Sequence, residues 1–157
     1  MKNPYLKPGR LADVIAAITA LGSYRYYKLS VEKWAERIAN KPKGADRWGK
    51  ILSEHPEFFR IGTDDKKASL VWRRQHPKLF DTRRHTEISP EEFLELEPEQ
   101  KERISRRPLD VSEITALINV AISLNERALE QAKFRKWWVP IAIGVLAFIG
   151  SFVGAWL

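Results

Sequence analysis

Basic side chains occur at two places in the first half of the chain, and contact with phosphate requires positive charge. One group begins in the turn-forming sequence NKPKG and continues along a predicted helix. The other lies in the sequence DDKKASLVWRR. The candidate nucleic-acid-binding residues are Lys41, Lys43, Arg47, Lys50, Lys66, Lys67, Arg73 and Arg74. The lysines would neutralise backbone phosphates, and Arg47 would donate to guanine.

The net charge of the chain favours an anionic partner. The formal charge is +7 at pH 7, and residues 1–89 hold 19 Lys and Arg against 10 Asp and Glu. The positive charge of this N-terminal part is typical of proteins that bind nucleic acid or an anionic lipid surface. Asp46 and Glu54 on the predicted helix, and Asp64 and Asp65 beside the lysines, would repel phosphate. Ordinary solvated surface charge is therefore the alternative.

Side chains for catalysis or metal binding are sparse. The chain has no cysteine, which excludes thiol nucleophiles, disulfides and cysteine-ligated zinc. His55, His76 and His85 are isolated, and there is no glycine-rich phosphate loop. The acidic residues between 91 and 99 fit helix N-termini better than a catalytic cluster. We therefore predict a protein that is not an enzyme and that uses no cofactor and no metal.

Helices followed by a hairpin must position the basic groups. Apolar residues recur at three- and four-residue steps and then alternate with period two. Gly22 ends the first helix, and Ser30 is the N-cap of the second. The predicted elements are helices over residues 10–21, 31–39 and 45–54, and strands over 58–61 and 69–74. The fold class is mainly α with a small β-hairpin (α+β).

This element order resembles the winged helix-turn-helix superfamily. The stretches that carry the resemblance are RLADVIAAI, SVEKWAERI, ADRWGKIL and EFFRI with SLVWRR, all within residues 10–74. The resemblance implies that the third helix, with Arg47 and Lys50, enters the major groove of DNA. It also implies that the wing, with Lys66 and Lys67, makes minor-groove or phosphate contacts. Many winged helices bind proteins instead, so DNA and an unknown protein are both open as partners.

The rest of the chain follows this basic, winged-helix-like domain, whose predicted range is 1–88. Residues 89–109 are predicted to form short acidic helices or a linker, because Ser89 and Pro90 are typical of a helix start. Residues 110–136 are predicted to form a long connector helix. Its apolar row would pack either on the domain or on a second copy of the chain, as a homodimer seam. That row is Ile114, Leu117, Ala121, Leu124 and Ala128.

The last stretch, 137–157, contains no charged side chain. As a helix it would be about 31 Å long, at about 1.5 Å per residue. The hydrocarbon core of a bilayer is about 30 Å thick, so the stretch predicts one transmembrane helix. Gly150 and Gly154 form a GxxxG pattern, which favours helix packing between two copies. Residues typical of a membrane interface flank or end the stretch: Lys133, Arg135, Lys136, Trp137, Trp138 and Trp156.

The positive residues before this stretch would remain in the cytoplasm, so the expected topology is a C-terminal tail anchor with a cytoplasmic N-terminal domain. A cleaved signal peptide over the first 22 residues is the competing interpretation, but Asp13 interrupts its apolar stretch. Two functions follow. One is a membrane-tethered winged-helix protein that binds DNA as a regulator at the cytoplasmic face of the lipid bilayer. The other is a protein-interaction or sensor module coupled to a self-associating membrane effector helix.

Overall fold

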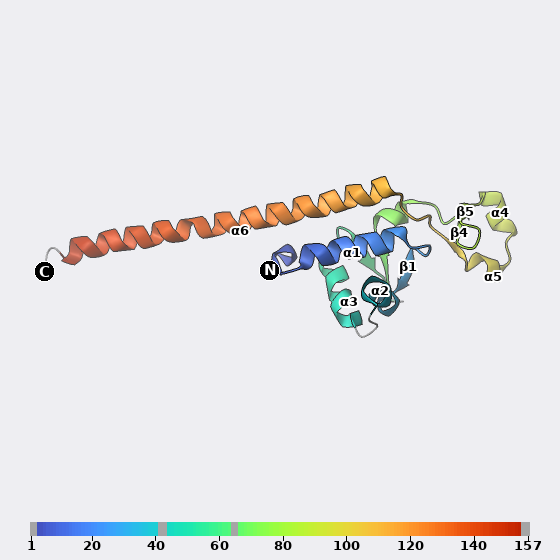
Figure 1. The fold of residues 1–157 in the computed structure, drawn as a ribbon, viewed down its shortest axis with the longest axis horizontal. Helices are drawn as coiled ribbons and strands as arrows, with labels where there is room; N and C mark the ends of the chain where they lie inside the picture. The colour runs from blue at the N-terminus through green and yellow to red at the C-terminus, as the bar shows by residue number, and fades with distance from the viewer. Residues whose placement is uncertain (1–2, 41–43, 64–65, 155–157) are drawn as a thin grey trace.

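The computed structural model describes residues 3–40, 44–63 and 66–154, with side chains as far as Phe134. The chain is an α+β protein in which a long helix, α6 (Val111–Gly154), lies along α1 (Arg10–Ser23). Figure 1 shows α6 continuing past the end of α1 at which the chain begins, with no other described element beside it there. The two elements are therefore in contact only over the first half of α6.

The described part of the N-terminal unit contains three α-helices, the 3₁₀ helix η1, and a three-stranded antiparallel sheet in the order β1-β3-β2. Leu29 of β1 faces Ala68 of β3, and Ala68 faces Ile61 of β2, so these three side chains share the core side of the sheet. The elements are η1 (Pro4–Leu6), α1, β1 (Lys28–Ser30), α2 (Val31–Ala39), α3 (Ala45–Glu54), β2 (Phe59–Ile61) and β3 (Lys67–Leu70).

The core of this unit is built from the apolar rows expected from the sequence. Trp34, Trp48 and Ile51 are buried between the helices and the sheet. The indole Nε1–H of Trp34 donates to the carbonyl of Ala68 at 2.9 Å, which satisfies the one polar group that this ring buries. Ser30 caps α2 as predicted, since its hydroxyl accepts from the backbone N–H of residue 33. Local capping and tertiary packing therefore favour the same helix boundaries here.

The predicted hairpin is incomplete in two respects. β1 adds a third strand, formed by three residues of a link that is too short to show alternation in the sequence. β3 also ends at Leu70 rather than at residue 74, because Val71 has helical backbone angles and a 3₁₀ helix, η3 (Trp72–Gln75), follows. This turn reverses the expected alternation: Trp72 is exposed and Arg73 is fully buried.

A second three-stranded sheet, absent from the sequence-based prediction, lies beyond η3 with the strand order β5-β4-β6. Its strands have only two residues each, so they leave no periodic pattern. Ser89 caps α4 as predicted, by accepting from the backbone N–H of residue 92 at 3.1 Å. The elements are β4 (Phe80–Asp81), β5 (Thr86–Glu87), α4 (Pro90–Glu95), α5 (Pro98–Lys101) and β6 (Ile104–Ser105).

The apolar row of α6 packs against the N-terminal unit of the same chain. Leu117, Ala121 and Ala128 are buried in the common core with residues of α1 and η1. Of the two alternatives for this row, the structure adopts packing on the chain's own domain. A homodimer through the same row would first have to separate α6 from α1.

The predicted transmembrane helix is wrong for the part of the chain that the structure describes. No helix among the described residues is long and apolar enough to cross a bilayer. The described part of α6 carries charged side chains such as Glu126, Arg127 and Glu130, each costly inside a membrane. The tail anchor and the membrane localisation lose their basis with it. The stretch 137–157 lies outside the residues whose side chains are described.

Most of the residues predicted to lie at the membrane interface or in the helix-packing pattern also fall outside the described side chains. Lys133 is described and lies exposed on α6. The backbone of α6 runs as one helix across the predicted boundary after residue 136. The remaining predicted interface and packing residues fall outside the described side chains: Arg135, Lys136, Trp137, Trp138, Trp156, Gly150 and Gly154.

Candidate functional site

The outer face of α3 carries the first group of predicted nucleic-acid-binding residues. Lys50 is exposed on it. Arg47 is also exposed, but its Nη2 donates to Asp13 of α1 at 2.6 Å, and its guanidinium lies 5.2 Å from the centre of the Trp48 ring. Lys41 and Lys43 lie outside the described residues. The face therefore presents one lysine directly and one arginine that is already paired.

The acidic residue expected to oppose phosphate at the end of α3 is neutralised. Glu54 forms ion pairs with Lys7 at 2.5 Å and with Arg10 at 3.0 Å. The hydrogen bond from Lys7 is the main reason that the pKa of Glu54 lies below its ordinary value of 4.5. Asp46 remains exposed at the start of the helix. The net charge that α3 presents is thus more favourable to an anion than its sequence suggests.

The turn between β2 and β3 carries the second group. Lys66 is exposed with a positive φ of 48°, and Lys67 is exposed at the start of β3. The backbone N–H of Gly62 donates to the carbonyl of Lys67 at 2.9 Å and closes the turn. Asp64 and Asp65 lie outside the described residues. The turn therefore places both lysines at the tip of the sheet.

Arg73 is not a surface contact, and its assignment to the nucleic-acid-binding group is wrong. Its side chain is fully buried and donates only to backbone carbonyls. Nη1 donates to Leu21 at 2.9 Å and Tyr24 at 2.6 Å, Nη2 to Arg106 at 2.5 Å, and Nε to Arg107 at 3.0 Å. The guanidinium thus joins the end of α1, the link after it, and the segment that leads into α6.

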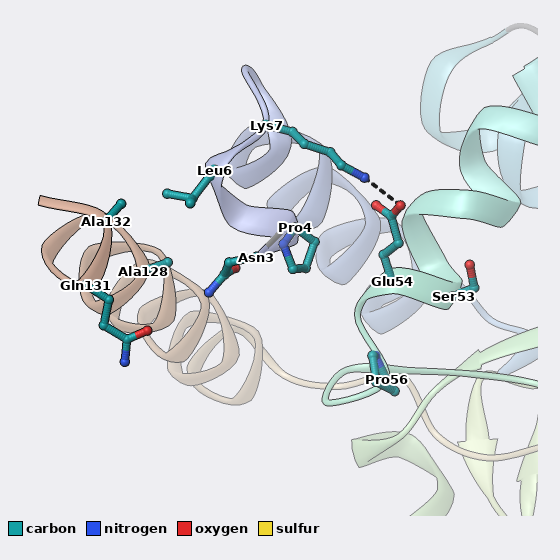
Figure 2. Close-up of a pocket in the computed structure, with 10 residues that line it drawn as sticks. All are labelled: Asn3, Pro4, Leu6, Lys7, Ser53, Glu54, Pro56, Ala128, Gln131 and Ala132. Carbon is teal, nitrogen blue, oxygen red and sulfur yellow. Dashed lines mark hydrogen bonds and ion pairs between the residues drawn. The ribbon is translucent and has the colours of Figure 1, made fainter. Parts of the chain in front are cut away.

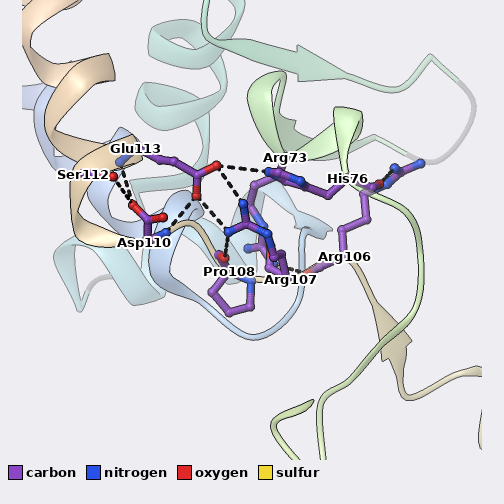
Figure 3. Close-up of polar contacts among 8 residues, drawn as sticks. All are labelled: Arg73, His76, Arg106, Arg107, Pro108, Asp110, Ser112 and Glu113. Atoms are coloured by element: carbon purple, nitrogen blue, oxygen red, sulfur yellow. Dashed lines mark hydrogen bonds and ion pairs between the residues drawn. The ribbon is translucent and has the colours of Figure 1, made fainter. Parts of the chain in front are cut away.

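The electrostatics of Arg73 fit this structural role. Burial, and secondly the nearby charge of Arg107, lower the pKa of Arg73 to about 10, so the side chain stays protonated at neutral pH. Figure 3 shows Glu113 reaching from α6 to Arg107 and His76 beside it. The Arg107–Glu113 pair is bidentate, with both distances 2.8 Å. Arg74, by contrast, is exposed on η3 and remains available at the surface.

Sequence reasoning missed a second basic surface, which lies between the two sheets. Its signal was the sequence RYYK at residues 25–28, in which two basic side chains flank two aromatic ones. Tyr26 lines two hollows, of about 520 Å³ and about 210 Å³. Each hollow is lined by three cationic side chains and one carboxylate. Cations around an aromatic ring are typical of surfaces that contact nucleic acid strands.

One of these cations is held in place by a buried carboxylate. Asp81 of β4 is buried and lies 3.1 Å from Nη2 of Arg103. Burial alone would raise the pKa of Asp81, but the N–H groups of Arg83 and Arg84 and the charge of Arg103 outweigh it and lower the pKa. The charge of Arg103 is therefore largely neutralised by Asp81 within the protein.

A larger hollow lies elsewhere, between η1, the end of α3 and the middle of α6, with a volume of about 880 Å³ (Figure 2). Its walls are mostly apolar, with Leu6, Pro56 and Ala132 among them. The ion pair of Lys7 and Glu54 forms part of its rim (Figure 2). The two charges of this pair therefore neutralise each other at the rim.

His55 and His76 make structural contacts, whereas His85 is exposed. His55 is buried, its Nδ1 lies 2.9 Å from Glu57, and its ring contacts Tyr5 edge to face at 4.6 Å. His76 lies 3.3 Å from Glu113. Within the described residues no three side chains of the metal-ligating types come together. That the chain is not an enzyme stays a prediction.

The fold and its surfaces define an α+β protein with two exposed basic surfaces, one on α3 and its neighbouring turn and one around Tyr26. Comparison with protein-family models, with curated proteins and with solved structures gives no significant match to this chain. The function must therefore be argued from the arrangement of the chain's own residues.

Proposed function

We propose that residues 10–70 form a winged-helix domain that binds duplex nucleic acid through α3 and the turn between β2 and β3. The sheet order is the observation that carries the proposal. β1 lies between α1 and α2 in the chain, and β3 pairs with it on one side and with β2 on the other. The sheet order is therefore β1-β3-β2, beside a core of three α-helices. In domains built on helix-turn-helix pairs, the later helix is the one that enters the major groove.

The position of α3 supports the proposal. Figure 1 shows α6 on one side of α1 and α3 on the other, so the long helix leaves the outer face of α3 uncovered. Lys50 on this face and Lys66 at the tip of the turn both point to solvent. Because Glu54 is paired with Lys7 and Arg10, its charge adds little repulsion. Electrostatic attraction then supplies most of the affinity, with little dependence on base sequence.

Arg47 gives this surface a feature that can be measured. Its ion pair with Asp13 holds the guanidinium against α1, so contact with a base or phosphate requires that pair to open. The variant Asp13→Asn removes the competing carboxylate while keeping its shape. We expect this variant to bind duplex DNA more tightly than the wild type.

The test is fluorescence anisotropy of a short labelled DNA duplex with the full-length chain at several salt concentrations. The double variant Lys50→Ala/Lys66→Ala should lower the slope of log affinity against log salt by about 1.8, at about 0.9 per phosphate contact. The control is Arg127→Ala/Lys133→Ala, which removes the same charge from exposed positions on α6. We call it the α6 control variant.

Two results would overturn the proposal. The first is an absence of duplex binding by the wild type at about 50 mM salt, where counterion release favours association most. The second is an equal loss of affinity in the α6 control variant, which would show that net charge, rather than α3 and the turn, attracts the duplex. Either result would favour a protein as the partner of this domain.

A further inference from the structure

The link between α1 and β1 is held rigidly from both sides. The carbonyls of Tyr24 and Tyr26 accept hydrogen bonds from buried Arg73. On the other side the backbone N–H of Tyr27 donates to the hydroxyl of Ser105 in β6 at 3.0 Å. The Tyr27 ring is covered by the guanidinium of Arg106 at 5.2 Å. A backbone fixed in this way presents the neighbouring Tyr26 ring without further ordering, which lowers the cost of binding.

Tyr26 lies between the two hollows and lines both of them. Arg25 lies over its ring at 5.3 Å and also lines the larger hollow, with Arg83 as a second exposed cation. Lys78 lines the smaller hollow. We call these four residues the Tyr26 surface. No ion pair of Arg25 or Arg83 occurs among residues 3–40, 44–63 and 66–134, so their charges face solvent.

The chemistry of the Tyr26 surface suits one class of ligand. Cationic side chains on both sides of an aromatic ring match alternating phosphates and bases of a nucleic acid strand. A base can stack on Tyr26 only when it is not enclosed in a duplex, because paired bases present their edges and not their faces. The hollows on either side would then receive the flanking phosphates.

We infer that the Tyr26 surface binds single-stranded nucleic acid, with a base stacked on Tyr26 and phosphates contacted by Arg25, Arg83 and Lys78. The inference rests on the proposed function, since it assigns a second nucleic-acid surface to the same chain. Lys67 of the turn also lines the smaller hollow, but the residues replaced in the two tests are different, and so are the forms of nucleic acid. Their contributions are therefore separable by experiment.

The test measures binding of a labelled oligothymidine single strand and a duplex to the same full-length variants. Arg25→Ala/Arg83→Ala should lower the salt slope for the single strand by about 1.4, at about 0.7 per contact. It should leave duplex binding unchanged. The α6 control variant should leave both unchanged. If Arg25→Ala/Arg83→Ala and the α6 control variant lost equal single-strand affinity, the inference would be overturned.

Stacking is tested separately from charge. Tyr26→Ala should weaken single-strand binding about fivefold or more, which corresponds to the loss of one stacked base. Tyr26→Phe keeps the ring and should bind like the wild type. Unchanged thermal unfolding midpoints would show that both variants are folded. If Tyr26→Phe bound as weakly as Tyr26→Ala, or if neither variant differed from the wild type, the assignment of a base stacked on Tyr26 would be wrong.

The duplex-binding measurements distinguish this inference from the proposed function. If the Lys50/Lys66 variant keeps duplex affinity while the Arg25/Arg83 variant loses single-strand affinity, the winged-helix proposal fails and the Tyr26 surface stands. The opposite pattern refutes the Tyr26 surface alone.

Discussion

Replacement of Arg73 by methionine removes the group on which three segments of the chain converge. The guanidinium donates to carbonyls of Leu21, Tyr24, Arg106 and Arg107, and more distantly to Tyr26 at 3.4 Å. Methionine fills a similar volume but donates no hydrogen bond. The variant therefore leaves these carbonyls without their partner in a region closed to solvent.

The cost of this replacement follows from two opposing quantities. Each buried acceptor left unsatisfied costs about 1–3 kcal/mol, and summing over the carbonyls would exceed the total stability of most small proteins. Removing a buried charge recovers several kcal/mol of desolvation, because Arg73 has no carboxylate partner among the described residues. The balance that we expect is a loss of about 3–5 kcal/mol, similar to removing one partner of a buried ion pair.

The assay is urea unfolding of the full-length chain followed by circular dichroism. Arg74→Met is a matched control, because Arg74 lies next in the same 3₁₀ helix but is exposed. The control should lose less than about 0.5 kcal/mol. If Arg73→Met were within about 1 kcal/mol of the wild type, the buried guanidinium would not be what joins α1, the link and the segment that leads into α6.

Three further substitutions test other contacts of the fold. Glu113→Gln should lose about 2 kcal/mol at neutral pH. The bidentate contact with Arg107 lowers the pKa of Glu113 below 4.5, so the stability that Glu113 contributes is complete above that pH and is lost as the pH falls further. The difference in unfolding free energy between wild type and variant, measured by urea titration, should therefore close at low pH. A constant difference would contradict this. Leu117→Ala should lose about 2–4 kcal/mol in the same titration, since this side chain packs α6 on the domain, and a loss near zero would mean that α6 is not part of the core. Trp34→Phe should lose about 2 kcal/mol because the carbonyl of Ala68 loses its donor, whereas an unchanged midpoint would mean that water replaces the indole.

The helices of the N-terminal unit could be predicted from the sequence because their signals are local. The row of Val14, Ile18 and Leu21 faces the core in the structure as its spacing indicates. The hydroxyl of Ser30 and the αL backbone of Asn40 mark the two ends of α2. Each of these signals depends on residues within one or two turns, so a single sequence contains them.

The strands and Arg73 could not be predicted, because long-range pairing determines them. β1 pairs with a strand about forty residues later, and each strand of the second sheet has only two residues. Period-two alternation continued through Trp72 and Arg73 and predicted the wrong faces, because one helical residue at Val71 shifts the phase. The site around Tyr26 was missed for the same reason, since its cations come from segments far apart in sequence.

Gly22 shows how a correct signal can have a different cause. A glycine at the end of an apolar row predicts a helix stop, yet α1 continues to Ser23 and Gly22 is a buried helical residue. A Cβ placed there would lie 3.1 Å from Cγ1 of Ile114 on α6, and the carbonyl of Gly22 accepts from the N–H of Leu109 at 3.0 Å. The glycine therefore permits the start of α6 to approach α1 closely. The predicted connector, up to about residue 128, is thus part of the same core as the N-terminal helices, because its apolar row and this close contact both pack it against them.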